Sequence, residues 1–452
     1  GFLGNSFQAD EALFATWARH IAVWRDPLLI TQALDKPPLL FYLQALFYPL
    51  VGPELWAARL PNLIAGMVLL PATAVLAWHW GRGETAVVLT AFLVALSPLL
   101  IQFTGSAYTD PLLVTLLLLA LLAAARQRPG WSGLWLGLAL WAKYQALVFA
   151  PLLVFVGWQQ AWGRRQWQRM ALAFLSLALL LPLWDLVRSG GFSLWQAQMV
   201  SYGGVRPAWS WELWPRLLAW GHLLATAVGA AWRLAPLLLV IIFGWLTARG
   251  EKETVWPVWL LLFAAAYLAV HWLLAVPVWD RYLLPIWPLL LLVVALGLAR
   301  FLVVLRPHAL QMALVLLFII FLLPPGLAAR EGRFGLGSTP AADDGAGRVA
   351  ALLAEAPYGT VLYDHWYSWQ WRYYFFDHTV YVSWVPGPAA LQADLAAFGQ
   401  QGPARYLALP ADRRALPMKT AVAEAGYQLL PVAPATSDAM TLYQLAPVEP
   451  LP

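Results

Sequence analysis

The hydrophobic residues of this chain collect in long runs, and the polar residues collect between the runs. Most of the runs approach the roughly 20 residues that an α-helix needs to cross a hydrocarbon core of about 30 Å. One stretch, 131–158, holds two shorter apolar halves and predicts two short helices. We therefore expect about ten membrane crossings, near residues 57–80, 85–103, 111–125, 131–142 with 145–158, 168–184, 231–248, 255–275, 283–305 and 309–327.

Basic residues mark one end of these segments. They fall in the connections that share one side of the membrane, and the positive-inside rule makes that side cytoplasmic. The residues are Arg82, Arg126, Arg128, Arg164, Arg165, Arg169, Arg249, Lys252 and Arg306. The outer side then carries residues 1–56, the turns at 104–110 and 276–282, the 185–230 loop and everything after about 328.

The first outer segment, 1–56, predicts two surface helices joined by a turn. From Glu11 to Trp24, apolar residues recur at the spacing of one helical face. A second helix is expected after DKPP (35–38), where proline suits a first turn, and it should end at Gly52. Because this segment lies outside, an odd number of spans must precede residue 8. We therefore expect a first transmembrane helix before the present numbering.

The last segment, 329–452, is richer in Gly, Pro, Asp and Ala and holds no run long enough to span a membrane. About 120 residues can bury one α/β core. We expect strands at 360–364, 379–384, 405–410 and 440–445, alternating with helices at 346–356, 388–398 and 418–425. The predicted domains are an outer loop with two juxtamembrane helices (1–56), a transmembrane domain (57–328) and an extracytoplasmic soluble α/β domain (329–452).

Composition supports a polytopic membrane protein and excludes several kinds of chemistry. Hydrophobic residues make up 61% of the 452 residues and charged residues only 11%, while soluble domains are about 25% charged. The absence of cysteine excludes disulfides, thiolate metal sites and a cysteine nucleophile. The seven histidines lack metal-ligand spacing, and a net charge of +5 points to membrane topology and not to a nucleic-acid partner. A zinc site built on the histidines is therefore not expected, although two neighbouring acids can hold a divalent ion.

Polar residues at the outer ends of the helices are the candidates for chemistry. Each has a structural alternative: Asp10, Asp35 and Asp110 could cap helices, and Glu11 could favour the positive end of a helix dipole. Arg281 could extend its side chain to lipid headgroups. Lys143 is harder to explain structurally, because an ammonium between two apolar halves needs an anion, water or a break in the helix. The candidates are Asp10, Glu11, Asp35, Lys36, Asp110, Lys143, Arg281 and Tyr282.

This mixture of acids and bases suits group transfer from a lipid phosphate. A carboxylate can take a proton from a hydroxyl or stabilise a developing positive charge on a sugar ring. Cations can bind a phosphate that leaves with its negative charge. A site at the interface would let a donor keep its lipid tail in the bilayer while its polar head reacts.

The ordered motifs resemble a known family. The segments DEALFA (10–15), DKPPLLFYLQALFYPLVG (35–52), LWAARLPNLIAG (55–66), TDPLLVTLLLLAL (109–121), GLALWAKYQALVFAPLL (137–153) and DRYLLPIWPLLLL (280–292) are similar to those of the GT-C glycosyltransferases. The similarity is to the group that contains the dolichyl-phosphate-mannose protein mannosyltransferases and the aminoarabinose transferases. It covers residues 8 to about 300.

The resemblance implies inverting transfer of a sugar from a polyprenyl-phosphate donor to a hydroxyl acceptor on the outer side of the membrane, in a bacterial inner membrane. Asp10 would be the catalytic acid-base residue, supported by Glu11. Lys36, Lys143 and Arg281 would bind the donor phosphate. Asp35, Asp110 and Tyr282 would line the pocket. The acceptor would be a protein, a lipid or a glycan, and the reaction would be independent of metal.

The sequence departs from the aminoarabinose branch at two positions. That branch has an Arg and a Tyr after the acidic pair, where this chain has Leu13 and Phe14. The positive charge would then come from Lys36, Lys143, Arg281 or Arg206. The outer domain also differs from the sugar-binding trefoil of eukaryotic protein mannosyltransferases, because helices and strands alternate in it.

Two other classes of function compete with an enzyme. A non-catalytic accessory subunit of a larger membrane complex would explain the missing Arg at position 13. A transporter or flippase fits less well, because the charged residues gather at one face and no inverted repeat is present.

Overall fold

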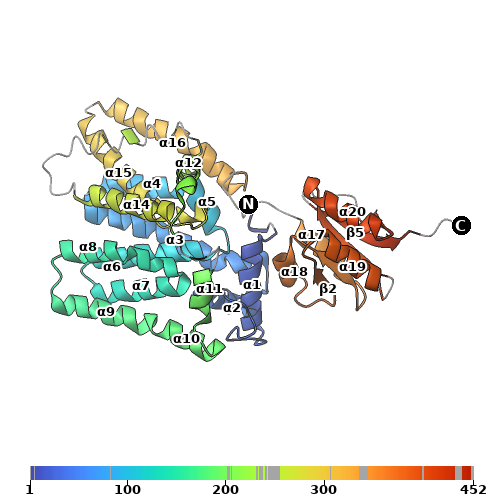
Figure 1. Ribbon diagram of the computed structural model, residues 1–452. Helices are drawn as coiled ribbons and strands as arrows, with labels where there is room; N and C mark the ends of the chain where they lie inside the picture. Colours follow the sequence, from blue (N-terminus) through green and yellow to red (C-terminus); the bar gives the residue numbers. More distant parts are fainter. Residues whose placement is uncertain are drawn as a thin grey trace. The chain divides into compact units, whose positions relative to one another are not determined.

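The computed structural model divides the chain into two compact units (Figure 1). One unit contains Gly1–Leu3 and His20–Thr339, and the other contains Gly4–Arg19 and Pro340–Pro452. The second unit thus includes most of helix α1 (Ala9–Ala22). The structure describes residues 2–4, 6–81, 83–200, 204, 206–230, 233, 238–239, 242, 255–305, 307–334, 345–399, 402–432 and 440–448.

The first unit is a bundle of apolar helices, in which α6, α7 and α9 lie side by side (Figure 1). Its core helix α6 is buried over most of its length because neighbouring helices cover it. The helices are α2 (Leu39–Val51), α3 (Leu55–Gly81), α4 (Glu84–Ala95), α5 (Pro98–Thr104), α6 (Thr109–Ala125), α7 (Pro129–Ala142), η2 (Tyr144–Phe149), α8 (Ala150–Gln159), α9 (Arg164–Ala178), α10 (Leu180–Ser189), α11 (Ser193–Val200), α12 (Ser210–Ala227), α14 (Val255–Leu273), η6 (Asp280–Tyr282), α15 (Trp287–Val304) and α16 (His308–Arg330).

The structure confirms a polytopic helical membrane protein. Within the described residues, five helices are long and apolar enough to cross a membrane: α3, α9 with α10, α14, α15 and α16. The pair α4 and α5 adds a sixth if it forms one bent span, and three further apolar helices are shorter. The expected segment 231–248 lies almost wholly outside the described residues. The described residues thus contain five or six full-length spans, and the other expected crossings are shorter helices or lie outside the described residues.

The breaks have local causes. Pro98 begins α5, and Ser97 before it accepts a hydrogen bond from the Leu100 N–H at 3.5 Å, so a new helix begins there at 60° to α4. The second break lies at Lys143, which adopts an extended conformation between α7 and η2. The prediction of two short helices in 131–158 is confirmed.

The two ends of α6 differ in character. Just after its C-terminal end, Gln127 donates to Gln160 at the end of α8 and accepts a hydrogen bond from Gln166 in α9. Arg126 donates to His79 at the end of α3. Asp110 lies at the opposite end of this helix, and at 1.5 Å per residue the separation is about 24 Å. The basic connection and the acidic candidate therefore lie at opposite ends of the bundle.

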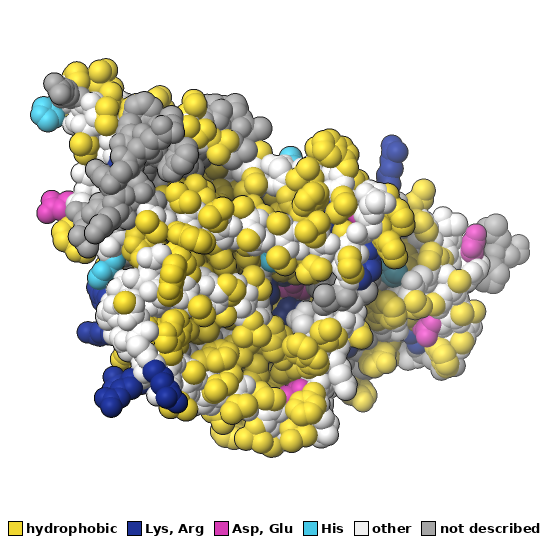
Figure 2. Space-filling model, turned by 60° about the vertical axis from the view of Figure 1, so that its left-hand side comes forward, with side chains coloured by type: hydrophobic (Ala, Val, Ile, Leu, Met, Phe, Trp, Pro, Cys, Tyr) yellow, Lys and Arg dark blue, Asp and Glu magenta, His cyan; other side chains and the backbone are white. Residues whose placement is uncertain are grey.

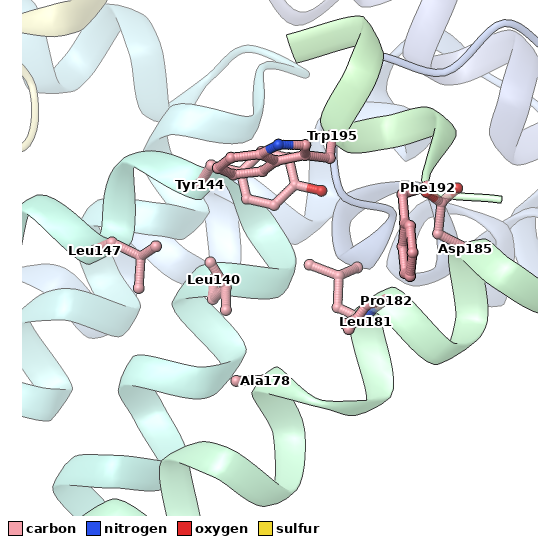
Figure 3. A pocket seen from close by; sticks show the side chains of 9 residues that line it. All are labelled: Leu140, Tyr144, Leu147, Ala178, Leu181, Pro182, Asp185, Phe192 and Trp195. Atoms are coloured by element: carbon pink, nitrogen blue, oxygen red, sulfur yellow. The ribbon is translucent and has the colours of Figure 1, made fainter. Parts of the chain in front are cut away.

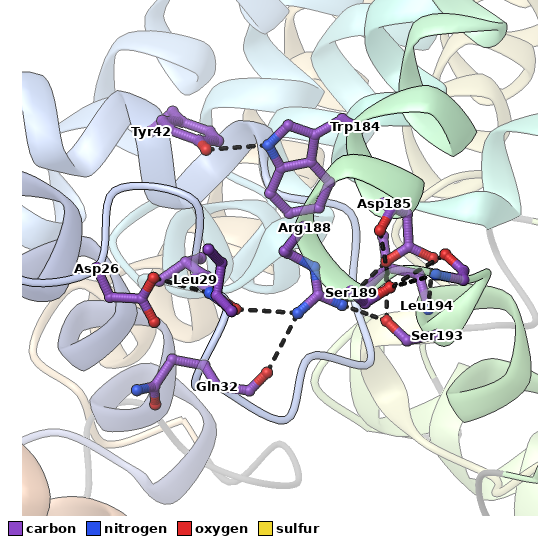
Figure 4. Close-up of polar contacts among 12 residues, drawn as sticks. Asp26, Leu29, Gln32, Tyr42, Trp184, Asp185, Arg188, Ser189, Ser193 and Leu194 are labelled. Carbon is purple, nitrogen blue, oxygen red and sulfur yellow. Dashed lines mark hydrogen bonds and ion pairs between the residues drawn. The ribbon is translucent and has the colours of Figure 1, made fainter.

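A buried ionic network fixes the loop that precedes Lys36 (Figure 4). Arg188 donates to Asp185 at 2.9 Å and to the carbonyl oxygens of Leu29 and Gln32 at 2.9 and 3.3 Å. Asp26 accepts the N–H groups of Ile30 and Thr31 in the same loop. Because both ions of the Arg188–Asp185 pair are buried, each needs further hydrogen-bond partners. The 26–32 loop supplies them to Arg188, and Ser193 and the Leu194 N–H supply them to Asp185.

A second network fixes the end of α14. Arg216 in α12 donates to four backbone carbonyl oxygens, those of His271, Trp272, Leu274 and Val276. These carbonyls would otherwise lack helical partners, so the guanidinium caps the helix. Close to this helix end, Arg206 forms a bidentate salt bridge with Glu212, and these hydrogen bonds lower the pKa of Glu212 to about 2.

The second unit contains a five-stranded sheet in the order β2-β1-β3-β5-β4. Strand β1 pairs in parallel with β2 and β3, while β5 pairs antiparallel with β3 and β4. Side chains alternate across the sheet: Leu362 packs with α17 and α18, and Tyr363 packs with α19 and α20. The elements are α17 (Ala346–Leu352), β1 (Val361–Asp364), α18 (Ser368–Tyr374), β2 (Tyr381–Trp384), α19 (Pro388–Phe398), β3 (Arg405–Pro410), η7 (Arg413–Ala415), α20 (Leu416–Glu424), β4 (Tyr427–Pro431) and β5 (Met440–Pro447).

Helix α1 (Ala9–Ala22) is helical as predicted, but its burial extends beyond the single apolar face that the sequence pattern indicates. Arg19 is buried because its guanidinium donates to the Tyr373 carbonyl at 2.8 Å, pairs with Asp377 and lies 4.3 Å from the Phe376 ring centre. These partners follow or lie in α18 of the same unit. The part of α1 around Arg19 is thus covered by protein.

Candidate functional site

A buried ion pair joins α6 to the end of α7. The Lys143 ammonium donates to an Asp110 carboxylate oxygen at 2.6 Å, and the two side chains are only 10% and 1% exposed. Asp110 lies in the first turn of α6, and Lys143 occupies the extended residue at which α7 ends. The helix break therefore brings the ammonium to the carboxylate, which provides the anion that its position requires.

Arg281 lies beside this pair in the short helix η6. Its guanidinium carbon is 4.1 Å from the ring centre of Trp279, 5.5 Å from that of Tyr108 and 6.0 Å from that of Tyr282. The Lys143 ammonium is 4.9 Å from the Tyr282 ring centre, so this ring contacts both cations. The Arg281 side chain is only 6% exposed and packs among protein groups.

Two further carboxylates accompany the cations. Asp280 is buried and accepts the backbone N–H of Arg281 at 2.7 Å. Burial raises the pKa of Asp280, although the positive charge of Arg281 opposes that rise. Asp35 pairs with its neighbour Lys36, which is itself buried. The charges of Arg281 and Lys36 both act on Lys143. Two of the predicted phosphate-binding cations, Lys36 and Arg281, therefore lie within electrostatic reach of the third, Lys143.

The capping alternatives for Asp35 and Asp110 do not hold. Helix α6 has Tyr108 at its N-cap and helix α2 has Pro38, and neither helix start has a side-chain cap hydrogen bond. The two carboxylates pair with lysines instead. Their role is electrostatic, since each partly neutralises a cation that would otherwise be buried among like charges.

A hydrogen-bonded group next to the cations was not predicted from the sequence. Gln145 donates to the Tyr267 hydroxyl, and Tyr267 donates to the Tyr282 carbonyl at 2.8 Å. His271 stacks on Tyr267 with ring centres 4.2 Å apart. The sequence does contain a pattern that indicates part of this group. Tyr267 and His271 are polar residues four positions apart in an apolar segment, so they share a helical face.

An apolar cavity of about 290 Å³ begins one residue after Lys143 (Figure 3). Its walls come from η2 on one side and from α10 and α11 on the other, with Tyr144, Leu147, Leu181, Phe192 and Trp195 among them. Asp185 is the acidic residue of the lining, and its carboxylate is bound within the Arg188 network. The cavity can therefore accept a hydrocarbon chain more readily than a polar group.

The face in Figure 2 is covered mostly by hydrophobic side chains, and basic side chains gather at its lower left edge. Exposed apolar residues of the bundle include Trp158 at 67% and Leu172 at 69%. Such exposure is unusual for a soluble surface and is the normal condition of helices that contact lipid.

Asp10 and Glu11 belong to the other compact unit, so the cluster of Lys36, Asp110, Lys143 and Arg281 as described contains neither of them. Asp10 is partly exposed in the first turn of α1. Glu11 is buried, and its carboxylate accepts the Gln8 N–H at 3.3 Å, which is the contact expected of an acid at a helix start. The catalytic roles of this pair stay predictions. Among the described residues, no group of three or more His, Asp or Glu side chains could hold a metal ion.

Comparison with solved structures defines the fold class. The chain is similar to two crystal structures of ArnT from Cupriavidus metallidurans, one bound to undecaprenyl phosphate (TM-score 0.63, 14% identity) and one in the apo state (TM-score 0.62, 15% identity). In both cases the match covers 98% of this chain and 94% of the other. The cryo-EM structure of the arabinofuranosyltransferase AftD from Mycobacteria is also similar (TM-score 0.51, 16% identity), over 98% of this chain and 40% of that one.

The protein therefore has the fold of the GT-C glycosyltransferases: a polytopic helical membrane protein with a C-terminal α/β domain. Residues 35–184 match the family described as dolichyl-phosphate-mannose-protein mannosyltransferase. A search of curated proteins finds no match. The resemblance noted in the sequence is confirmed, and the matched range includes Lys36, Asp110 and Lys143.

Proposed function

We propose that the protein is a membrane glycosyltransferase that moves a sugar, with inversion, from a polyprenyl-phosphate donor to a hydroxyl acceptor on the extracytoplasmic side. The observation that carries the proposal is the cluster of Lys36, Lys143 and Arg281 around the buried Asp110. The three cations are all buried, and ammonium and guanidinium groups form strong charge-assisted hydrogen bonds to phosphate oxygens. The family match and the fold support this reading.

The proposed reaction is a single displacement. The bond between the sugar C1 and the phosphate oxygen breaks, and the phosphate leaves with the bonding electron pair. Lys143 and Arg281 stabilise that charge, with Lys36 beside them. The acceptor oxygen forms a new bond to C1 from the opposite face, and Asp10 takes the hydroxyl proton, with Glu11 supporting it. The cations supply the electrostatic stabilisation, so the proposal includes no metal and no cofactor.

The apolar cavity next to Tyr144 would hold the start of the polyprenyl chain. Its lining includes Tyr144, which directly follows Lys143 in the sequence. In this proposal the phosphate binds at the cations and the first isoprene units lie against this lining. The ArnT crystal structure with undecaprenyl phosphate is a precedent within this fold. The acceptor and membrane lipids would be the other partners.

The two ends of the bundle support an outer location for the site. Arg126, Arg128 and the arginines at the start of α9 share the end opposite to Asp110. By the positive-inside rule that end is cytoplasmic, so the cation cluster lies at the extracytoplasmic end. In a bacterium this would be the periplasmic side of the inner membrane.

Replacing Arg281 by lysine tests the phosphate site. A lysine cannot reproduce the planar fork of donors or the stacking on Trp279, so we expect kcat/KM for the donor to fall by about 10- to 100-fold. The measurement is release of undecaprenyl phosphate from a panel of undecaprenyl-phosphate sugars by protein in lipid nanodiscs. Arg414→Lys is the control, because Arg414 pairs with Asp412 at an exposed position of the other compact unit. Equal effects of the two variants would contradict the assignment.

An accessory subunit of a larger membrane complex is the alternative. Leu13 and Phe14 stand where the aminoarabinose branch has an Arg and a Tyr, and this chain lacks that cation. Failure of the wild-type protein to release undecaprenyl phosphate from any donor of the panel, together with copurification in a complex of fixed stoichiometry, would favour the alternative.

A further inference from the structure

Two segments that carry the proposed phosphate site meet at one buried tyrosine. Tyr267 of α14 is 1% exposed, and its hydroxyl donates to the Tyr282 carbonyl at 2.8 Å. The same hydroxyl accepts an N–H from Gln145, which lies two residues after Lys143. Tyr282 directly follows Arg281. One phenol therefore connects the segment of Lys143 to the segment of Arg281.

The hydrogen-bond roles in this group are fixed by its acceptors. A carbonyl oxygen only accepts, so His271 uses Nδ1–H to donate to the Tyr267 carbonyl at 2.9 Å. Its Nε2 then carries the lone pair and accepts the second N–H of Gln145 at 3.3 Å. The amide nitrogen of Gln145 thus uses one hydrogen for Tyr267 and the other for His271. The arrangement contains no net charge when His271 is neutral.

A neutral scaffold matters because the two cations repel each other. Lys143 and Arg281 both contact the Tyr282 ring, at 4.9 and 6.0 Å from its centre. Two like charges that contact the same ring repel each other in a poorly solvated environment, so the surrounding structure must fix their spacing. Tyr267 fixes the backbone of Tyr282, and the rings of Phe149 and His271 pack against Tyr267.

We propose that Tyr267, with Gln145, is a positioning residue that sets the distance between Lys143 and Arg281 and so prepares the site for a phosphate. The inference rests on the proposed function, because the phosphate belongs to the polyprenyl donor. Tyr267 itself contacts the backbone of Tyr282 and not the substrate, so its effect on chemistry is transmitted through the two cations.

The test removes one oxygen atom. Tyr267→Phe keeps the aromatic packing and deletes the hydroxyl, and we expect the Kd for undecaprenyl phosphate in nanodiscs to rise about tenfold. The matched control is Thr115→Val. Thr115 is buried in α6 and its hydroxyl donates to the Ala65 carbonyl of α3 at 3.0 Å, so it loses the same kind of bond between helices, away from the cations.

A purely structural role for Tyr267 would lower the Tm and the amount of folded protein without changing the Kd of the folded fraction. We expect Tyr267→Phe and Thr115→Val to lower the Tm by similar amounts, while only the first weakens binding. We also expect Tyr267→Phe to add little once Lys143 is replaced by glutamine, because the spacing then no longer matters. A wild-type Kd in Tyr267→Phe, or equal weakening in both hydroxyl variants, would overturn the inference alone. Absence of binding to the wild-type protein would overturn the inference and the proposed function together.

Discussion

Asparagine in place of Asp10 is expected to lower kcat by about 10²- to 10⁴-fold, the usual contribution of a general base. Asparagine has nearly the same shape and still forms hydrogen bonds, but it cannot take the acceptor proton. Because Asp10 is partly exposed in the first turn of α1, the helix should form without its charge. The measurement is sugar transfer in nanodiscs under single-turnover conditions, with the Kd for undecaprenyl phosphate determined on the same preparation.

The control for this variant is Glu424→Gln, since Glu424 is an exposed acid at the end of α20 in the same compact unit. It should retain wild-type turnover. For Asp10→Asn we expect an unchanged Tm and an unchanged Kd for undecaprenyl phosphate. Turnover within a few-fold of wild type would remove Asp10 from the proposed mechanism.

The second large effect concerns the buried pair between Asp110 and Lys143. Asp110→Asn should lower the free energy of unfolding by about 3–5 kcal/mol, because it leaves a buried ammonium without its anion. Turnover should fall as well, since Lys143 would no longer be held at the end of α6. Thermal unfolding in nanodiscs measures the first effect, and release of undecaprenyl phosphate measures the second.

Removing both charges separates stability from function. The double variant Asp110→Asn, Lys143→Met should recover most of the lost stability, because replacing a buried ion pair by neutral groups is often tolerated. It should not recover turnover, because methionine cannot bind the donor phosphate. A double variant that is both stable and fully active would show that the pair is only structural.

Much of the transmembrane architecture could be predicted because it follows from local properties of the chain. The observed helices α3, α6, α14, α15 and α16 coincide closely with the expected apolar segments. The break at Lys143 was also predictable, since an ammonium in an apolar run requires a change in the backbone or a partner. The angle between α4 and α5 was not, because it depends on packing as well as on Pro98.

The second compact unit shows where prediction of secondary structure from the sequence falls short. The four predicted strands and three predicted helices are present, but α18 and β4 were missed. Helix α18 is short and rich in aromatic residues, which resemble a strand in composition. Strand β4 follows a helix after only two residues and depends on its pairing with β5. Its stabilisation comes from a partner distant in the sequence.

The candidate site shows the same division. Lys36, Lys143 and Arg281 were selected as isolated polar residues, and the structure brings the charges of Lys36 and Arg281 within reach of Lys143. The group of Gln145, Tyr267 and His271 was not selected, because none of these residues is unusual alone. Their hydrogen bonds depend on how η2, α14 and η6 pack, which the spacing along the chain does not specify.

The most direct test of the phosphate site is a cryo-EM or crystal structure of the protein with undecaprenyl phosphate. We expect the phosphate to lie within hydrogen-bonding distance of the Lys143 ammonium and the Arg281 guanidinium, with the first isoprene units against Tyr144 and Leu147. A phosphate bound elsewhere, with Lys143 and Arg281 contacting only protein, would contradict the account.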